Sequence, residues 1–210
     1  MISGLYAVTP DCADTEVLLV QARAALMGGA RIFQYRSALT NAQLRFEQAD
    51  ALRTLCRTYD TLLIINNDLA LAAKVDADGV HIGAHDASVE EARTVLGADK
   101  IVGVSCYDDI GRARAAAAQG ADYVAFGSFF VSSTKPAAAR PGLDLLRTAR
   151  SQTALPIVAI GGVDLRNASA LIAAGADAIA VISALFTATD IEATARQFCN
   201  LFDSENYDFA

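Results

Sequence analysis

The sequence predicts an α/β protein built as a single (β/α)₈ TIM barrel. Eight short runs of β-type residues alternate with alanine-rich amphipathic stretches from one end of the chain to the other. A length of 210 residues suits one such barrel and leaves little room for a second domain. Similar units of about one strand and one helix also recur along the chain, which is typical of this class.

The predicted strands are short and apolar, as expected for a parallel sheet that is covered on its outer face. Their ranges are Leu5–Thr9, Arg31–Arg36, Leu62–Asn66, Gly79–Ile82, Ile101–Ser105, Tyr123–Phe126, Ile157–Ile160 and Ala178–Ile182. The predicted helices are Glu16–Met27, Asn41–Tyr59, Val89–Leu96, Ile110–Gln119, Leu143–Gln152, Asn167–Ala174 and Ile191–Phe202.

Capping residues support these boundaries. Side chains that accept hydrogen bonds from the first helical turn stand where helices are expected to begin, and glycines follow the expected helix ends. The predicted N-caps are Asp14, Thr40 and Ser88, and the predicted C-terminal glycines are Gly28, Gly97, Gly120 and Gly175.

An internal repeat favours closure of the eight units into a barrel. The segments GGARIF, VDADGVHI, QGADYVAF and AGADAIAV each combine a helix stop with the start of a strand. The first strand-to-helix turn carries no GxGxxG motif of the kind that open dinucleotide-binding sheets use. We expect the barrel to occupy residues 1–202 and the polar residues 203–210 to form a loose C-terminal tail.

Composition narrows the function classes. The net charge of −7 disfavours binding to nucleic acid or to an anionic membrane, and no apolar stretch approaches the roughly 20 residues of a membrane span. The N-terminus reads as a strand and not as a secretory signal. Four scattered cysteines without a CxxC pair are expected to be reduced. We therefore expect a cytoplasmic protein that acts on small molecules, and a homo-oligomer is compatible with the sequence.

Polar residues gather at the carboxyl ends of the predicted strands, which is where barrels of this class carry their active sites. A barrel with a purely structural role would have no reason to collect them there. The polar side chains are those of Gln34, Arg36, Asn66, Asn67, Asp68, His81, Asp86, Ser105, Ser132, Ser133, Thr134, Lys135 and Ser183, and Gly161, Gly162 and Ile182 offer backbone groups beside them.

Several of these residues have two readings. Gly161 and Gly162 could let the backbone approach a phosphate, as in the last two loops of many barrels, or could only turn a tight loop. Arg36, on a strand expected to be buried, needs either an anionic ligand or a carboxylate partner. Asp68 and Asp86 could bind a hard cation such as Mg²⁺ or could cap helices. The histidines His81 and His85 are expected to have packing and loop roles.

At these residues the chain resembles thiamine-phosphate synthase. The segments GLYAVT, GGARIFQYR, LIINND, ADGVHIG, GVSC, GADYVAFGSFFVSSTKP, IVAIGGV and GADAIAVISALF match in order, from about residue 4 to 202. FGSFFVSSTKP is the most specific of them, because many related barrels share the glycine-rich final loops but lack this one.

The resemblance implies a transferase of thiamine biosynthesis. That family joins 4-amino-2-methyl-5-(diphosphooxymethyl)pyrimidine to 4-methyl-5-(2-phosphoethyl)thiazole, or its carboxylated form, and gives thiamine phosphate and pyrophosphate with Mg²⁺. The mechanism is dissociative: diphosphate leaves, a pyrimidine-methyl cation forms, and the thiazole nitrogen captures it. Such a reaction needs positioning and electrostatic stabilisation more than a general base.

The resemblance also implies roles for individual residues. Gln34, Arg36, Asn66 and Ser105 would contact the pyrimidine diphosphate, and Lys135 would bind its diphosphate, with Arg36, Ser105 and Lys135 as the catalytic set. Ser132, Ser133 and Thr134 would contact the thiazole substrate. Backbone amides of Gly162, Ile182 and Ser183 would hold its phosphate. Asp86 would bind Mg²⁺, together with Asn67 or Asp68.

Two positions depart from the family pattern. Ala38 stands where the family has a lysine, and Asn67 stands where it has the first metal-binding aspartate. We expect a weaker synthase, unless Asp68 moves in or a cation such as Arg31 or Arg140 compensates. Two alternatives are a thiazole tautomerase of the same fold, whose histidine is replaced here by Tyr107, and a non-catalytic barrel that binds a phosphorylated ligand.

Overall fold

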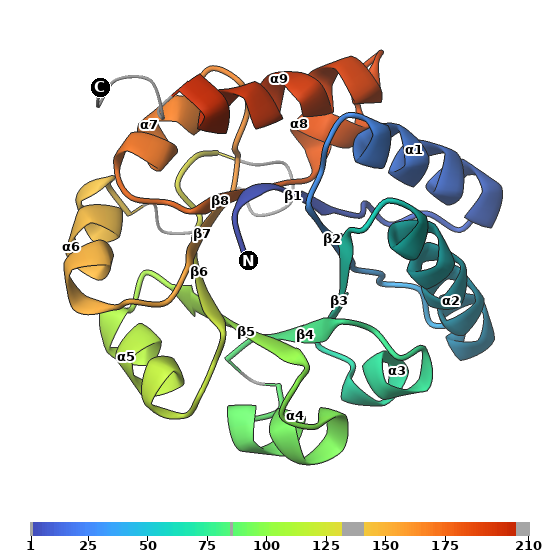
Figure 1. The fold of residues 1–210 in the computed structure, drawn as a ribbon, viewed down its shortest axis with the longest axis horizontal. Coiled ribbons are helices and arrows are strands. Elements are labelled where there is room, and N and C mark those ends of the chain that lie inside the picture. The colour runs from blue at the N-terminus through green and yellow to red at the C-terminus, as the bar shows by residue number, and fades with distance from the viewer. Residues whose placement is uncertain (1, 85, 132–140, 205–210) are drawn as a thin grey trace.

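A computed structural model describes residues 2–84, 86–131 and 141–204, and its eight parallel strands form a closed barrel (Figure 1). Each strand pairs with its neighbours in chain order, and β8 closes the ring on β1. The predicted TIM barrel is thus confirmed. The strands are β1 (Gly4–Val8), β2 (Ile32–Tyr35), β3 (Leu62–Asn66), β4 (Gly79–Ile82), β5 (Ile101–Tyr107), β6 (Tyr123–Gly127), β7 (Ile157–Ile160) and β8 (Ala178–Val181).

The helices form an outer ring around the barrel (Figure 1). They are α1 (Thr15–Met27), α2 (Ala42–Thr58), α3 (Leu69–Lys74), α4 (Val89–Leu96), α5 (Ile110–Ala118), α6 (Asp144–Gln152), α7 (Ala168–Ala173), α8 (Ser183–Phe186) and α9 (Ile191–Ser204). The sequence did not indicate α3 or α8, because six and four residues are too few to show helical periodicity.

The capping predictions hold with two corrections. Asp14 and Ser88 are N-caps, whereas α2 is capped by Asn41 and not by Thr40. The left-handed residue after α1 is Gly29, with φ of +100°, and not Gly28. Gly28 is needed for a different reason: a Cβ on it would lie 2.4 Å from the Cβ of Ala195, so a side chain there would push α1 away from α9.

Alternating residues of each strand feed two apolar layers, one between the barrel and the helices and one inside the barrel. In β1, Leu5 and Ala7 face the helices while Tyr6 and Val8 fill the interior. Gly103 of β5 leaves space for the ring of Tyr123, because a Cβ on Gly103 would lie 1.9 Å from the Cζ atom of that ring. The interior of the barrel therefore holds two large phenols.

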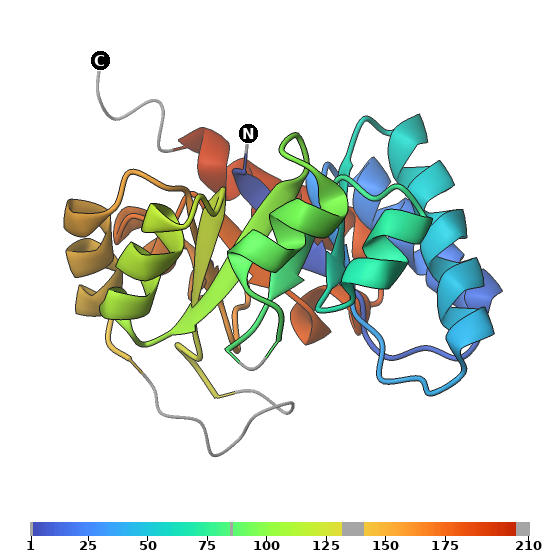
Figure 2. The same cartoon turned by 90° about the horizontal axis from the view of Figure 1, so that it is seen from below.

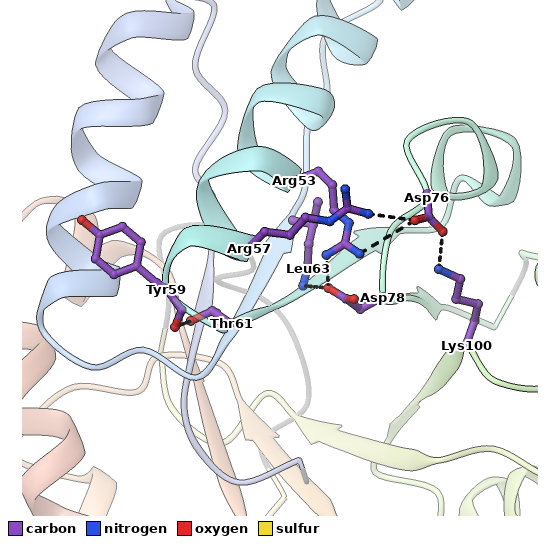
Figure 3. Close-up of polar contacts among 8 residues, drawn as sticks. All are labelled: Arg53, Arg57, Tyr59, Thr61, Leu63, Asp76, Asp78 and Lys100. Carbon is purple, nitrogen blue, oxygen red and sulfur yellow. Dashed lines mark hydrogen bonds and ion pairs between the residues drawn. The ribbon is translucent and has the colours of Figure 1, made fainter.

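Three of the repeated segments contain an aspartate just before the strand, and each of these aspartates accepts hydrogen bonds from an arginine and from a backbone amide at the amino ends of the strands. Asp78 accepts hydrogen bonds from Arg53 of α2, at 2.8 Å, and from the backbone amide of Leu63, at 2.7 Å (Figure 3). Each such aspartate thus binds the amino end of the neighbouring strand together with the helix that precedes that strand. The other two sets are Arg93 and Val102 on Asp122, and Arg150 and Ile157 on Asp177.

A second aspartate extends the first of these sets outward. Asp76 lies within ion-pair distance of Arg53, Arg57 and Lys100 (Figure 3). The hydrogen bond from Lys100 is the largest of the effects that lower the pKa of the Asp76 carboxyl. Because this side chain is mostly exposed, the cluster is a surface feature of the amino end of the barrel.

The opposite end of the barrel carries the loops that follow the strands, which lie along the lower edge of Figure 2. In the described part of the chain, no helix is both long and apolar enough to cross a membrane. The cysteines Cys12, Cys56, Cys106 and Cys199 are free thiols, as the sequence predicts. The division between residues 202 and 203 stays a prediction; α9 itself runs on to Ser204.

Candidate active site at the carboxyl ends of the strands

A cavity of about 600 Å³ opens at the carboxyl end of the barrel. Residues from β1 to β8 and from the loops that follow them contribute to its walls. It is lined by all the predicted substrate-binding residues that lie in the described ranges, namely Gln34, Arg36, Asn66, Ser105, Gly162, Ile182 and Ser183. The predicted residues Ser132, Ser133, Thr134 and Lys135 fall outside the described residues.

Arg36 follows β2 and is held at the rim by the loop after β1. Its backbone amide donates to Thr9 Oγ1 at 2.8 Å, and the Thr9 hydroxyl donates to the Arg36 carbonyl at 2.7 Å. Its guanidinium lies 3.4 Å from the Asp11 carboxylate, and the Arg36 side chain is 34% exposed. Arg36 is therefore half-buried and not buried as expected, and of the two expected partners a carboxylate, that of Asp11, is present. Within residues 2–84, 86–131 and 141–204, this long ion pair leaves most of the five guanidinium donors for a ligand.

Asn67 and Asp68, which follow β3, differ in backbone conformation and in the contacts of their side chains. Asn67 has φ of +64°, a left-handed conformation that asparagine tolerates. Asp68 is the N-cap of α3: its Oδ1 accepts from the Leu71 amide at 2.9 Å, and its Oδ2 lies 2.5 Å from Arg45. Both carboxylate oxygens of Asp68 are already engaged within the chain.

Asp86 lies in the loop after β4, next to the rim. Its Oδ2 accepts from the backbone amide of Gly83 at 2.8 Å, so the loop folds back on itself. Tyr107 ends β5 with φ of +56°, and its hydroxyl accepts from the Ala84 amide at 3.4 Å. Among the described residues, no three histidine, cysteine, aspartate or glutamate side chains come close enough to hold a metal together.

A chain of hydrogen bonds crosses the floor of the cavity. Gln34 Nε2 donates to the Tyr6 hydroxyl at 2.7 Å, and the hydroxyls of Tyr6 and Tyr123 are 2.8 Å apart. The Tyr123 hydroxyl lies 3.0 Å from His81 Nδ1, and His81 Nε2 lies 2.8 Å from Ser105 Oγ. Two predicted substrate-binding residues, Gln34 and Ser105, are thus connected through three residues to which the sequence assigned no binding role.

Burial keeps this chain uncharged. It lowers the pKa of His81 to about 4, an effect that the nearby Asp86 carboxylate only partly opposes. It also raises the pKa of both phenols well above the ordinary value. His81 stacks on the Tyr123 ring with centroids 5.6 Å apart, so it has the packing role expected of it and a polar contact with the site as well.

Ser105 is also fixed from its backbone side. The Arg112 Nε of α5 donates to the Ser105 carbonyl oxygen at 2.6 Å. The pairing of β5 with β6 shifts register between Ser105 and Tyr107, which is a bulge of the kind often found next to active sites. The side chain and the backbone of Ser105 are therefore held by different elements.

Gly161 and Gly162 are required by the neighbouring loop as well as by their own conformation. Their φ angles are +103° and +67°. A Cβ on Gly161 would lie 2.7 Å from the Ser128 Cα, and one on Gly162 would lie 2.5 Å from the Val131 carbonyl oxygen. The two glycines thus let the segment after β6 pack closely against the loop after β7. This packing is a reason for glycine at these positions in addition to ligand approach and a tight turn.

At the last strand, Ile182 precedes α8 and Ser183 begins it. The amides of a first helical turn have no carbonyl partner within their own helix, which leaves them available to an anion. Arg31, which the sequence offers as a compensating cation, precedes β2, and its side chain lies beside Gly4 at the start of β1. Arg31 is therefore at the far end of the barrel from the cavity. Arg140 lies outside the described residues.

Sequence reasoning missed the residues that support the site from behind. Tyr6 and Tyr123 read as ordinary apolar strand positions, and Asp11 as a loop residue. The only available signal was strand alternation, which places Tyr6 and Tyr123 on the inner face of the barrel. Asp164, which lines the cavity after β7, gave no signal.

Comparison with known proteins identifies close relatives. The thiamine monophosphate synthase family matches residues 5–185. The thiamine-phosphate synthase of Methylobacillus flagellatus is 55% identical over 202 residues, covering 96% of each chain, and that of Thiobacillus denitrificans is 52% identical with the same coverage.

Among solved structures, a thiamine phosphate pyrophosphorylase from Pyrococcus furiosus superposes with a TM-score of 0.86, at 33% identity over 96% of each chain. A 3-hexulose-6-phosphate synthase with 21% identity and a TM-score of 0.70 shares the barrel, and that likeness shows the fold alone.

Proposed function

The chain belongs to the thiamine monophosphate synthase family, and we propose that it condenses an aminopyrimidine methyl diphosphate with a thiazole phosphate, giving thiamine phosphate and pyrophosphate. It is an enzyme of thiamine biosynthesis. The observation that carries the proposal is the coincidence of 55% identity over nearly the whole chain with a cavity lined by the expected residues. No observation on the cavity favours the tautomerase.

The two substrates would bind on opposite sides of the cavity. Gln34 and Arg36 on the side of β2, with Asn66 after β3, would hold the pyrimidine diphosphate. Backbone amides of Gly162 and Ser183, on the side of β7 and β8, would hold the thiazole phosphate. This arrangement directs the thiazole ring toward the pyrimidine, and such orientation lowers the barrier without chemical participation of the protein.

In the reaction, the bond between the pyrimidine methylene carbon and the diphosphate oxygen breaks, and both electrons leave with the diphosphate. The lone pair of the thiazole nitrogen then forms the new bond to that carbon. Arg36 and Lys135 would stabilise the negative charge on the leaving group, where fixed donors are most effective. No proton has to be removed from the thiazole nitrogen, so the site needs no general base.

Magnesium would be held by Asp86, with the amide oxygen of Asn67 as a second donor. One carboxylate, one amide and the oxygens of a diphosphate form the hard oxygen donor set that this cation prefers, so the residues present fit it. When bound, it would neutralise part of the diphosphate charge. Asp68 would not belong to this set, because Leu71 and Arg45 engage its oxygens.

The composition of the chain supports proposals about its location and its partners. With a net charge of −7, we propose that the enzyme works on small phosphorylated substrates in the cytoplasm and binds neither nucleic acid nor membrane. The free thiols agree with a reducing compartment. A homo-oligomer is compatible with all these observations.

The proposal is tested by incubating the protein with both phosphorylated substrates and Mg²⁺ and detecting thiamine phosphate by mass spectrometry. We expect product only when both substrates are present, and strongly reduced product for Asp86→Asn. Isomerisation of the thiazole phosphate in the absence of the pyrimidine would point to the tautomerase instead. Absence of any product at saturating substrates and Mg²⁺ would contradict the proposal.

A further inference from the structure

The hydrogen bonds on the cavity floor run through two buried phenols, and each phenol has one hydrogen to donate. Tyr6 is 1% exposed and its oxygen accepts from Gln34 Nε2. Among the described residues, the acceptor left for the Tyr6 hydrogen is the Tyr123 oxygen at 2.8 Å. Because a buried hydroxyl without an acceptor is costly, the hydrogen of Tyr6 lies toward Tyr123.

The same reasoning carries the direction onward to His81. The Tyr123 oxygen accepts from Tyr6, so its own hydrogen goes to His81 Nδ1 at 3.0 Å. A neutral imidazole carries one hydrogen, and with Nδ1 acting as an acceptor that hydrogen is on Nε2. His81 Nε2 then donates to Ser105 Oγ at 2.8 Å. The Ser105 hydroxyl hydrogen is left to point into the cavity that this residue lines.

We propose that this chain of hydrogen bonds has one direction, from Gln34 to Ser105, and that it selects an aminopyrimidine over an oxopyrimidine. Tyr6, Tyr123 and His81 are positioning residues that fix Ser105 as a donor and prevent the Gln34 amide from turning over. The identity of the ligand rests on the proposed function; the direction of the chain does not.

The selectivity follows from what the ends of the chain offer a ligand. Gln34 keeps one amide hydrogen and its carbonyl oxygen, which match a ring nitrogen beside an exocyclic amino group. An oxo group in place of the amino group exchanges donor and acceptor along that edge of the ring. Gln34 could meet it only by turning over, which would put its oxygen on Tyr6 and force every hydrogen in the chain to reverse.

The first test is the tautomer of His81 in the ligand-free protein at neutral pH, measured by ¹⁵N NMR of the imidazole. The protein has two histidines, so the imidazole signals that remain in His85→Gln belong to His81. We expect the hydrogen on Nε2. Tyr6→Phe should keep that tautomer and the hydrogen bond to Nδ1, because Tyr123 still donates to it. Tyr123→Phe should shift the Nδ1 signal toward that of an imidazole nitrogen that accepts no hydrogen bond. A hydrogen on Nδ1 in the parent protein would overturn the direction.

The second test is the ratio of kcat/KM for the aminopyrimidine diphosphate to that for its oxo analogue. Tyr123→Phe frees Tyr6 to donate to a reversed Gln34, so the ratio should fall roughly five- to tenfold, the effect of about one hydrogen bond. Tyr35→Phe is the matched control. It also removes the hydroxyl of a buried tyrosine, but that hydroxyl donates to Gln48 and takes no part in the hydrogen bonds between Gln34 and Ser105. The ratio of kcat/KM values for Tyr35→Phe should therefore stay at the parent value.

The outcomes separate this inference from the proposed function. An unchanged ratio in Tyr123→Phe would overturn the selectivity. If the parent protein turned over neither pyrimidine, the proposed function would fail, and the NMR result would still decide whether the chain of hydrogen bonds has the direction proposed.

Discussion

Arg36 illustrates how a residue can be identified from the sequence for an incorrect reason. Its position at the end of a strand suggested a buried cation, but the structure leaves it half-buried at the rim, beside Asp11. The loop after β1 brings Asp11 there, and no local pattern in the sequence could reveal a contact between residues 25 positions apart. The location of Arg36 was predictable, and its partner was not.

Replacement of Arg36 tests its role on the leaving group. Arg36→Gln should lower kcat/KM roughly ten- to hundredfold, because charge-assisted hydrogen bonds of about 1.5 to 3 kcal/mol would be lost. Arg147→Gln removes an exposed arginine of α6 and should leave activity unchanged. Equal activity of Arg36→Gln and the parent in steady-state assays would show that Arg36 serves only its pair with Asp11.

His81 makes stability depend on pH in a predictable direction. Its pKa is about 4 in the folded protein and about 6.5 when unfolded, so between these values the unfolded state binds more protons. The contribution is fully present above pH 6.5 and is lost as the pH falls toward 4, by about 3 kcal/mol.

The measurement is the free energy of unfolding by urea between pH 7.5 and 4, for the parent and for His81→Gln. The parent should lose more stability on acidification than the variant over this interval. Parallel curves for the two proteins would mean that His81 does not remain neutral in the folded state.

At the scale of elements, the repeated aspartates explain how similar sequence segments give similar strand starts. The sequence showed the repeat but not its purpose, because the arginine partners lie about 25 to 29 residues away on preceding helices. The strands and long helices were predictable from periodicity and caps. The short helices α3 and α8 were not, since the barrel imposes them in spite of weak local signals.

Breaking one of these contacts should destabilise the barrel. Arg53→Gln leaves the partly buried Asp78 carboxylate without its cation, and the free energy of unfolding should fall by about 1 to 3 kcal/mol. Arg147→Gln breaks an exposed pair within α6 and should change it by about 0.5 kcal/mol or less. Equal effects in urea titrations would contradict a structural role for the repeated aspartates.

At the scale of the whole molecule, the site combines residues from both halves of the barrel, and two positions depart from the pattern that the resemblance implies. Ala38 is exposed beside Arg36, and its amide donates to Asp11 at 2.6 Å. Asn67 is exposed after β3. Neither affects the core, so the fold is insensitive to both departures, and their consequences should be confined to catalysis.

Restoring the family residues should therefore strengthen the enzyme without changing its stability. Ala38→Lys adds a cation for the diphosphate, partly offset by Asp11, and should raise kcat/KM. Asn67→Asp adds a carboxylate and should lower the Mg²⁺ concentration needed for half-maximal rate. Steady-state kinetics of both single variants and the double variant across a Mg²⁺ titration decide this. If none of the variants gains activity or affinity for Mg²⁺, other residues of the protein have replaced the missing lysine and aspartate.

Product stoichiometry tests most directly whether a metal-assisted condensation takes place in this cavity. Thiamine phosphate and pyrophosphate are measured together, with both substrates present, as Mg²⁺ is titrated and then removed with a chelator. The two products should appear in equal amounts, rise with Mg²⁺ and stop with the chelator. Pyrophosphate released without thiamine phosphate, or turnover that is unaffected by excess chelator, would contradict a metal-assisted condensation.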